Sequence, residues 1–233
     1  MVDIMEESTI QSRTYERLRE KIVKMELKPG QKIVISDLME SLGVGRTPLR
    51  ESLKQLQRQN LIYTVPQSGT YISKIDMVQA VQSRFIRECI EKEIMVELSA
   101  KINDKHIREL EAILDDQRRE FELKDRSKYH DLDNQFHETC YRIVSKEQIW
   151  SWINTYNTHL DRFRWLHLEK ATFDYNLVLK EHEALLEAVM NKNIDEVKFL
   201  TVSHIRFMLK SQADIFDLYP NYFTEKSVEL VKD

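Results

Sequence analysis

The stretch that decides the fold is Leu42-Gly43-Val44-Gly45-Arg46-Thr47-Pro48-Leu49-Arg50-Glu51-Ser52-Leu53. Its two glycines interrupt any helix that enters from the N-terminal side, and Gly43 is typical of the position just after a helix end. Pro48 is tolerated in the first turn of a helix, so a new helix is expected to open at Thr47-Pro48. Two short helices around a tight turn form a helix-turn-helix, and we expect Ser36 to cap the first of them.

The residues on either side complete a winged helix-turn-helix over residues 13–75. Upstream, apolar side chains recur at helical spacing between Tyr15 and Met25. Downstream, 61–65 and 70–75 are rich in β-forming residues, and the turn residues Pro66 to Gly69 join them as a hairpin, the wing. Residues 1–12 are expected to form a flexible tail.

The second helix of this motif is expected to read DNA. Residues 41–75 hold five basic side chains against Glu51 alone, although the whole chain carries a net charge of −4. Side chains in the first turn of such a helix can reach phosphates or a guanine edge in the major groove. The expected DNA contacts are Arg46, Thr47 and Arg50 on the helix, and Gln67, Ser68 and Gly69 on the wing, where Gly69 allows close backbone approach. The alternative is a helical hairpin that only caps the larger domain.

The rest of the chain indicates an all-helical domain at 76–218, so the protein is expected to be mainly α. From Val78 to Tyr219 the sequence contains neither glycine nor proline. We expect about six helices, at 77–101, 104–124, 127–144, 147–170, 174–191 and 193–218. An apolar stripe from Ile149 through Tyr156 to Phe163 is expected to face the core, with His167 packed behind it. The C-terminal tail, 219–233, is expected to be frayed.

Composition is compatible with a cytoplasmic protein. Cys89 and Cys140 form no CxxC pair and are both expected to be buried. No apolar run reaches the roughly 18 residues of a membrane helix, and the acidic N-terminus does not resemble a secretory signal. We therefore expect no membrane association.

Four side chains in the helical domain could hold a metal. Asp133 and His137 are four residues apart, so they lie on the same helix face. His182 and His204 lie on two later helices. One carboxylate and three imidazoles suit Zn, Ni or Mn, with positions left open for a ligand. Spacing alone, however, favours a surface pair and structural histidines.

Two sets of residues resemble a known family. The run 42–53, with 56–72 behind it, resembles the DNA-binding domain of the GntR family, although Gly45 replaces the usual serine and Asn60 the usual glycine. Asp133 to His137, Glu181 to Ala188 and His204 resemble the FCD ligand-binding domain of the FadR-like subfamily, in its shorter, VanR-like branch.

The resemblance implies function as well as fold. It implies a transcriptional regulator that binds a near-palindromic double-stranded DNA operator as a homodimer. It implies a divalent metal ion on Asp133, His137, His182 and His204, and a small organic-acid effector whose carboxylate reaches the metal. Arg87 matches a position that often faces the effector, although a salt bridge to Glu91 is an equal alternative. Arg162, Arg164 and Trp165 are candidates to line the pocket, and a role in the core or on the surface is the alternative.

Two other interpretations stay open. His130-Asp131 resembles the motif of metal-dependent phosphohydrolases of the HD type, although that leaves the DNA-binding domain unexplained. A regulator whose Asp/His cluster is purely structural is the third possibility.

Overall fold

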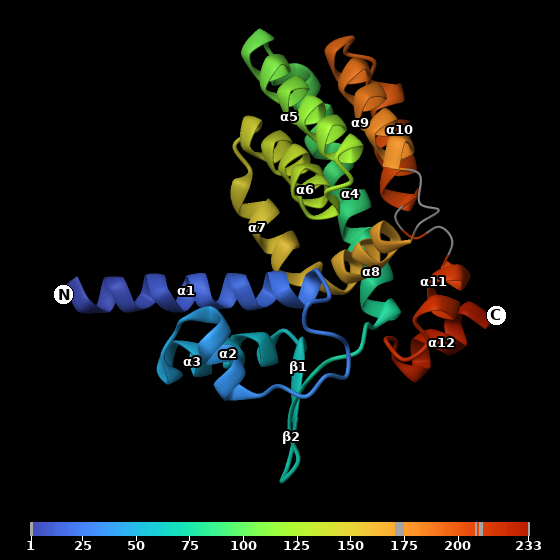
Figure 1. Cartoon of the computed structure of the whole chain (residues 1–233). Coiled ribbons are helices and arrows are strands. Elements are labelled where there is room, and N and C mark those ends of the chain that lie inside the picture. The colour runs from blue at the N-terminus through green and yellow to red at the C-terminus, as the bar shows by residue number, and fades with distance from the viewer. Residues whose placement is uncertain (1, 171–174, 208, 210–211, 233) are drawn as a thin grey trace. The chain divides into compact units, whose positions relative to one another are not determined.

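The computed structural model of the chain describes residues 2–170, 175–207, 209 and 212–232 (Figure 1). The described residues divide into two compact units. One combines residues from the 1–77 stretch with residues from 213–233, and the other lies within 78–212. The C-terminal end of the chain therefore belongs to the same unit as the N-terminal domain.

The first unit is a winged helix-turn-helix with two added C-terminal helices. Its elements are α1 (Val2–Val23), α2 (Ile35–Leu42), α3 (Arg46–Arg58), β1 (Ile62–Val65), β2 (Gly69–Ile72), α11 (Gln212–Leu218) and α12 (Glu225–Lys232). The two strands pair antiparallel, with Ile62 opposite Ile72 and Val65 opposite Gly69. Buried side chains of α1, α2, α3 and the wing form one core, which includes Leu18, Leu49 and Leu56.

The expected turn between α2 and α3 is confirmed, but its expected cap is wrong. Gly43 adopts the left-handed conformation (φ 66°), and its N–H donates to the carbonyls of Met39 and Glu40. Such a φ is readily accessible to glycine. Ser36 does not cap α2, because the helix already begins at Ile35. Its hydroxyl donates to Oδ1 of Asp37 at 3.0 Å instead.

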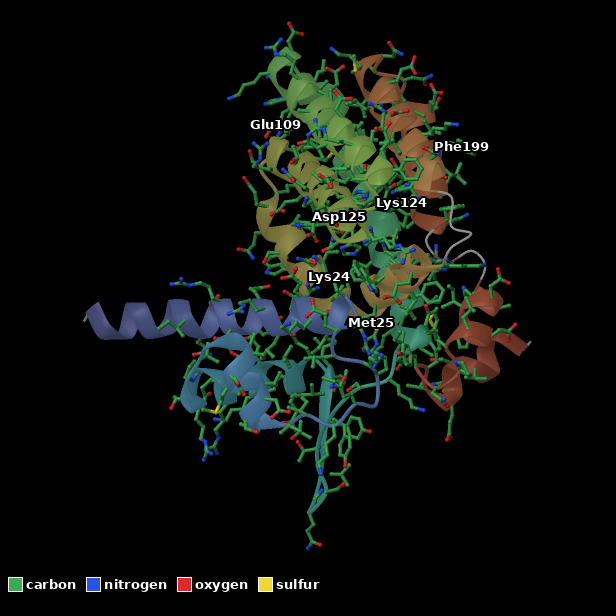
Figure 2. The ribbon with its side chains drawn as sticks, viewed as in Figure 1. Lys24, Met25, Glu109, Lys124, Asp125 and Phe199 are labelled. Carbon is green, nitrogen blue, oxygen red and sulfur yellow. The ribbon has the colours of Figure 1, made fainter. Side chains whose placement is uncertain are left out.

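Helix α1 differs from expectation at its start. It begins at Val2, so described residues of the expected tail, 1–12, are helical; residue 1 lies outside the described residues. The helix ends where Met25 adopts a left-handed conformation (φ 58°), a role usually taken by glycine (Figure 2).

The expected frayed tail at 219–233 instead contains α12 and a buried contact. Phe223 is 1% exposed and forms a parallel bridge with Ile75, just before α4. The ring of Phe223 also stacks on Phe216 with centroids 4.1 Å apart. A partner about 150 residues away in sequence orders this end of the chain, and residue 233 lies outside the described residues.

The second unit is helical throughout its described residues. Its helices are α4 (Met77–Lys101), α5 (Asp104–Glu122), α6 (Arg126–Ile143), α7 (Glu147–Tyr156), α8 (Thr158–Glu169), α9 (Tyr175–Met190) and α10 (Ile194–Phe207). Helix α5 packs on α6 and α9, and α9 packs on α10 (Figure 1). Phe199 of α10 is 71% exposed, on the outside of these helices (Figure 2). Within the described residues, no helix has the length and apolar character needed to cross a bilayer.

Two expected helices are divided in the structure. The helix expected at 147–170 breaks at Asn157, whose side chain donates to Asp161 at 2.8 Å. Asparagine competes locally with helical hydrogen bonding and favours such junctions. The break takes Tyr156 out of the expected core stripe, and it is 73% exposed. The helix expected at 193–218 is divided into α10 and α11; residues 208 and 210–211, like residue 174 at the expected start of the preceding helix, lie outside the described residues.

Candidate metal centre and nucleic-acid interface

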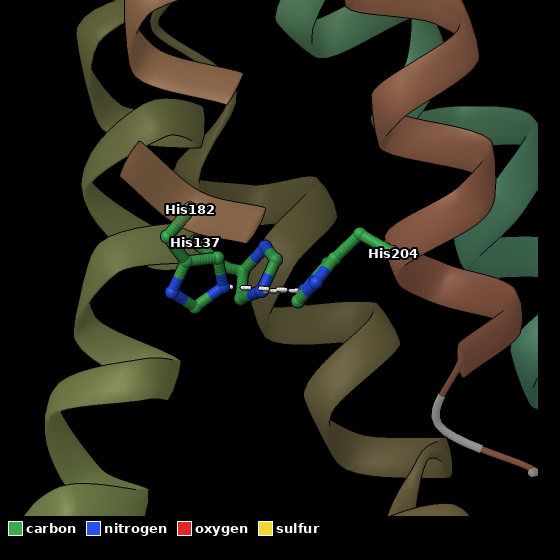
Figure 3. A group of neighbouring side chains, drawn as sticks. All are labelled: His137, His182 and His204. Atoms are coloured by element: carbon green, nitrogen blue, oxygen red, sulfur yellow. Dashed lines mark hydrogen bonds between the residues drawn. The ribbon is translucent and has the colours of Figure 1, made fainter. Parts of the chain in front are cut away.

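Three histidines meet in the interior of the helical unit. His137 comes from α6, His182 from α9 and His204 from α10, and none is more than 3% exposed. The Nε2 atom of His204 lies 3.2 Å from Nε2 of His182 and 3.3 Å from Nε2 of His137 (Figure 3). We call these three residues the histidine cluster. Their ligand atoms lie close enough together to hold one metal ion.

Each of the three imidazoles has a side-chain oxygen close to its other nitrogen. Glu91 Oε2 lies 2.9 Å from Nδ1 of His137, and Glu181 Oε2 lies 2.9 Å from Nδ1 of His204. Gln117 Oε1 lies 3.4 Å from Nδ1 of His182. A proton on each Nδ1 leaves the Nε2 lone pairs facing one another, an arrangement that a cation stabilises. The donor set therefore fits a divalent metal.

Asp133 joins the cluster at one edge. Its Oδ1 lies 3.8 Å from Nε2 of His182, while its Oδ2 forms an ion pair with Arg164. The structure thus brings the three sequence-predicted histidines within reach of one ion, whereas Asp133 lies beside His182 and outside that group of three.

The charge states at the cluster suit metal binding. Burial lowers the pKa of His137 and lowers that of His182 well below its ordinary value, so both stay neutral at pH 7. Burial alone would raise the pKa of Asp133, but the positive charge of Arg164 outweighs it and the net shift is downward. The pKa of Glu91 shifts down for the same reason, beside Arg87 and His137. Neutral imidazole and ionised carboxylate are the forms that bind metals.

Arg87 forms the salt bridge to Glu91 that was expected as the alternative to an effector contact. It is fully buried, its Nε donates to Oε1 of Glu91, and its guanidinium lies 5.9 Å from the ring centre of Trp150. Through Glu91 it is linked to His137. Burial would lower the pKa of Arg87, but Glu91 raises it overall, so the pair stays charged.

Sequence reasoning missed most of the residues around the ligands. Glu181 directly precedes His182, and Glu91 lies four residues after Arg87, so both left a weak signal. Gln117 left none, because nothing in the sequence says that its face of α5 meets α9.

The HD dipeptide lies outside the histidine cluster. His130 is buried with its ring edge-on to Trp165 at 5.5 Å, whereas the Asp131 side chain is 55% exposed.

His167 packs in the interior against Phe163 at 4.8 Å, as expected. Arg162 and Trp165 are buried. Cys140 is buried, but the expectation for Cys89 is wrong, because it lies on an exposed face of α4.

The helix-turn-helix presents its basic side chains to solvent. Arg46, Thr47 and Arg50 are all exposed near the start of α3, and the first turn of the helix contains no acidic side chain. Lys54, one turn farther on, is paired with Glu51 at 2.7 Å. The start of α3 is therefore the part of this helix that is best suited to bind an anionic partner.

The wing is exposed at its tip but is packed inside its own unit at Gly69. Gln67 is exposed with a left-handed φ of 60°, and the Ser68 hydroxyl lies 2.5 Å from that of Tyr71. A Cβ on Gly69, whose φ is 141°, would lie 2.7 Å from Cε of Lys32. Because that atom belongs to the flexible end of the lysine, the positive φ is the stronger reason for a glycine at this position.

A winged helix-turn-helix in one unit and a buried histidine cluster in a helical unit together indicate a two-domain transcriptional regulator. Residues 10–72 match the family model of bacterial regulatory proteins, gntR family, and residues 82–207 match that of the FCD domain. The chain belongs to the GntR family of DNA-binding transcriptional regulators, with an FCD effector-binding domain.

Relatives of known name support this assignment. The transcriptional repressor RspR of Escherichia coli K12 is 26% identical over 217 residues, covering 93% of this chain and 95% of the relative. The gluconate operon repressor of Bacillus licheniformis is 24% identical over 204 residues, covering 86% and 79%.

Solved structures share the fold. E. coli McbR/YncC matches with a TM-score of 0.76 at 18% identity, over 90% of this chain and 98% of that one. A GntR-type regulator from Rhodococcus sp. RHA1 matches with a TM-score of 0.69 at 16% identity, over 90% and 98%.

Proposed function

We propose that this regulator holds one divalent ion, Zn, Ni or Mn, on Asp133, His137, His182 and His204, and that a small carboxylate effector completes the site. The observation that carries the proposal is the convergence of three Nε2 atoms, each in an imidazole whose Nδ1 lies 2.9 to 3.4 Å from a side-chain oxygen. The ion would supply a localised positive charge and open positions for a carboxylate oxygen. Because one relative is named for the gluconate operon, gluconate is a suitable first probe.

We further propose that α3 carries the operator contacts. Arg46 and Arg50 would bind bases or phosphates, Thr47 would support them, and Gln67, Ser68 and the backbone at Gly69 would approach DNA from the wing. Exposure of the first turns of α3 supports this assignment. Operator binding by a bacterial regulator implies a cytoplasmic location.

We also propose that the protein binds a near-palindromic operator as a homodimer. Two helices of the FCD unit expose large apolar side chains: Phe85 and Ile86 on α4, and Trp152 and Tyr156 on α7, at 60%, 48%, 60% and 73%. The Ser83 hydroxyl donates to the carbonyl of Tyr156 at 3.3 Å, so these helices adjoin. An apolar face on adjoining helices suits a second copy of the chain.

The metal proposal is tested by ion content. Wild-type protein stripped with chelator is titrated with Zn²⁺, Ni²⁺ and Mn²⁺, and compared with His182→Ala and His204→Ala. The matched control is His106→Ala, on α5 outside the histidine cluster. We expect one ion per chain in wild type and control, and loss of binding in both cluster variants. Equal ion content in all four proteins would exclude the site.

The DNA proposal is tested on the same helix. Arg46→Ala and Arg50→Ala should each lower operator affinity by about 1–3 kcal/mol where a base contact is lost. Loss of a phosphate contact should instead reduce the salt slope by about one unit. Arg58→Ala, at the far end of α3, is the control. Full affinity in the folded Arg46/Arg50 double variant would refute the assignment.

A further inference from the structure

Asp133, the only carboxylate in the proposed ligand set, has its two oxygens in different environments. Oδ1 faces the histidine cluster, 3.8 Å from Nε2 of His182. Oδ2 accepts from Nη2 of Arg164, which reaches it from α8. One oxygen is therefore directed to the proposed ion, and the other is taken by a guanidinium.

Arg164 is itself held in place from two sides. Its Nη1 donates to Oδ1 of Asp161 and to Oδ1 of Asn134, each at 3.2 Å. Asp161 is in turn held by Asn157 at the break between α7 and α8. The Arg164 side chain is 10% exposed and that of Asp161 is 4% exposed. A guanidinium tied to three oxygen atoms in the interior has little freedom to leave its carboxylate.

We propose that Arg164 is a positioning residue that reserves Oδ1 of Asp133 for the metal, so that Asp133 binds through one oxygen only. This inference rests on the metal site proposed above. A carboxylate without such a partner can turn and bind an ion through both oxygens. By holding Oδ2, Arg164 keeps one more coordination position open for the carboxylate of an effector.

The test uses Co²⁺ as the probe, because its visible absorption weakens as coordination number rises. Chelator-stripped wild type, Arg164→Gln and Arg164→Lys are titrated with Co²⁺. In Arg164→Gln we expect weaker absorption per bound ion and an affinity loss of about 10–100-fold. Arg164→Lys can still bind one oxygen of Asp133, so it should restore most of the absorption per bound ion and most of the Co²⁺ affinity.

A second variant, Asp161→Asn, keeps the proposal testable if Arg164→Gln does not fold. Asp161→Asn keeps the Arg164–Asp133 pair but removes one charge that holds the guanidinium, and it should shift the Co²⁺ spectrum in the same direction by less. Wild-type spectra and affinity in Arg164→Gln, or in Asp161→Asn when Arg164→Gln does not fold, would overturn the positioning role. Failure of wild type to bind any ion would instead refute the metal site itself.

A separate observation concerns the C-terminal end of the chain. The Ile75 N–H donates to the Tyr222 carbonyl at 2.8 Å, and the Thr224 N–H donates to the Ile75 carbonyl at 3.0 Å. The Met77 N–H, at the first residue of α4, donates to the Ser227 hydroxyl at 2.8 Å. We call the contact of 222–227 with 75–77 the C-terminal clasp.

The clasp is a packed and fully satisfied contact. Ile75, Met77, Phe223 and Ser227 are each at most 1% exposed. Ser227 supplies to α4 the side-chain cap that helices usually receive from the residue just before them, here from 150 residues away. The start of α4 is therefore fixed by the other end of the chain.

Both segments that connect the two units also carry a residue of the metal centre. Helix α4 runs without a break from Met77 to Glu91, which contacts His137. Helix α10 carries His204; residues 208 and 210–211 after it lie outside the described residues, and α11 and the clasp follow in the sequence. We infer that the clasp couples the metal centre to the DNA-binding unit, because it joins the ends of both connecting segments.

The coupling is measured as the ratio of operator affinity with and without saturating Zn²⁺. Ser227→Ala should speed hydrogen exchange of the Met77 amide by about five-fold, the equivalent of one lost cap of about 1 kcal/mol. Ser227→Ala should also bring the ratio of operator affinity with Zn²⁺ to operator affinity without it closer to one; we call this the Zn²⁺ ratio. Ser99→Ala, which removes another buried hydroxyl from α4, is the control for general destabilisation.

A variant ending at residue 218 completes the test. It should retain operator binding and lose the effect of Zn²⁺ on it. An unchanged Zn²⁺ ratio in both Ser227→Ala and the truncated protein would overturn the coupling role, as would a ratio of one in wild type. Faster Met77 exchange with an intact ratio would leave the clasp a purely structural contact, and would likewise overturn the proposal.

Discussion

The metal-free protein should lose stability as the pH falls below neutrality, because two buried histidines resist protonation. Burial lowers the pKa of both His137 and His182 in the folded chain. In the unfolded chain both recover an ordinary pKa of about 6.5. Above that value both states are neutral, and the stability is fully present. Below it the unfolded state takes up protons that the folded state does not, so the free energy of unfolding falls with pH.

The size of this effect follows from linkage. Each histidine that stays neutral in the folded state contributes a slope of up to about 1.4 kcal/mol per pH unit below its unfolded pKa. Two such residues give at most about 3 kcal/mol per unit, a large fraction of a typical domain stability of about 5–15 kcal/mol. Stopping at about pH 5 keeps most carboxylates of the unfolded chain ionised.

The assay is urea unfolding in excess chelator, followed by tryptophan fluorescence between about pH 7.5 and pH 5. His182→Gln should remove about half of the slope, whereas His106→Gln, outside the histidine cluster, should leave it unchanged. Saturating Zn²⁺ should increase wild-type stability at pH 7.5 and lose that increase at low pH, since protons compete for the same nitrogens. A wild-type unfolding free energy that is flat over this range would refute the reasoning.

Three further substitutions test particular contacts. Asn103→Ala should cost about 1 kcal/mol in thermal unfolding, since its side chain accepts from two backbone N–H groups at the start of α5, whereas Ser36→Ala should cost about 0.5 kcal/mol or less. Gly43→Ala should cost about 1–2 kcal/mol through its left-handed backbone alone, because no atom lies within 4 Å of the added Cβ; a larger loss would indicate a steric clash. Phe85→Glu should shift the protein to monomer in sedimentation at micromolar concentration, and an unchanged dimer would exclude that face of α4.

The features that the sequence predicted best are those with local causes. The turn at Gly43 and the wing depend on residues within a few positions of one another. Asn60 could also be interpreted locally, because it adopts the left-handed conformation (φ 58°) where the family usually has glycine. Local backbone preferences decide such positions whatever packs around them.

The features that the sequence did not predict depend on distant partners. Nothing near Ser227 indicates that its hydroxyl would meet Met77, and nothing near Ile75 indicates a bridge to Phe223. The break at Asn157 was missed for a different reason, since the apolar stripe runs straight through it. Periodicity alone does not register a helix junction made by one polar side chain.

The candidate metal centre also contains some residues that the sequence could indicate and others that depend on distant partners. Asp133, His137, His182 and His204 could be named only through a family resemblance, because their spacing alone favoured structural roles. Of their partners, Arg164 was named only as one of several pocket candidates and Gln117 was not named, because tertiary packing decides which sides of α5 and α8 face the centre. Arg87 pairs with Glu91 in the structure, and the effector contact that the resemblance implies for it stays a prediction.

The charges around the histidine cluster indicate an order of binding. Carboxylates lie beside all three imidazoles: Asp133 near His182, Glu91 beside His137 and Glu181 beside His204. An anionic effector is repelled by these carboxylates, and a divalent ion offsets their charge. Gluconate binding should therefore require prior metal loading, and calorimetry should show no gluconate binding in chelator. Equal gluconate affinity with and without metal would mean that the acid binds elsewhere in the chain.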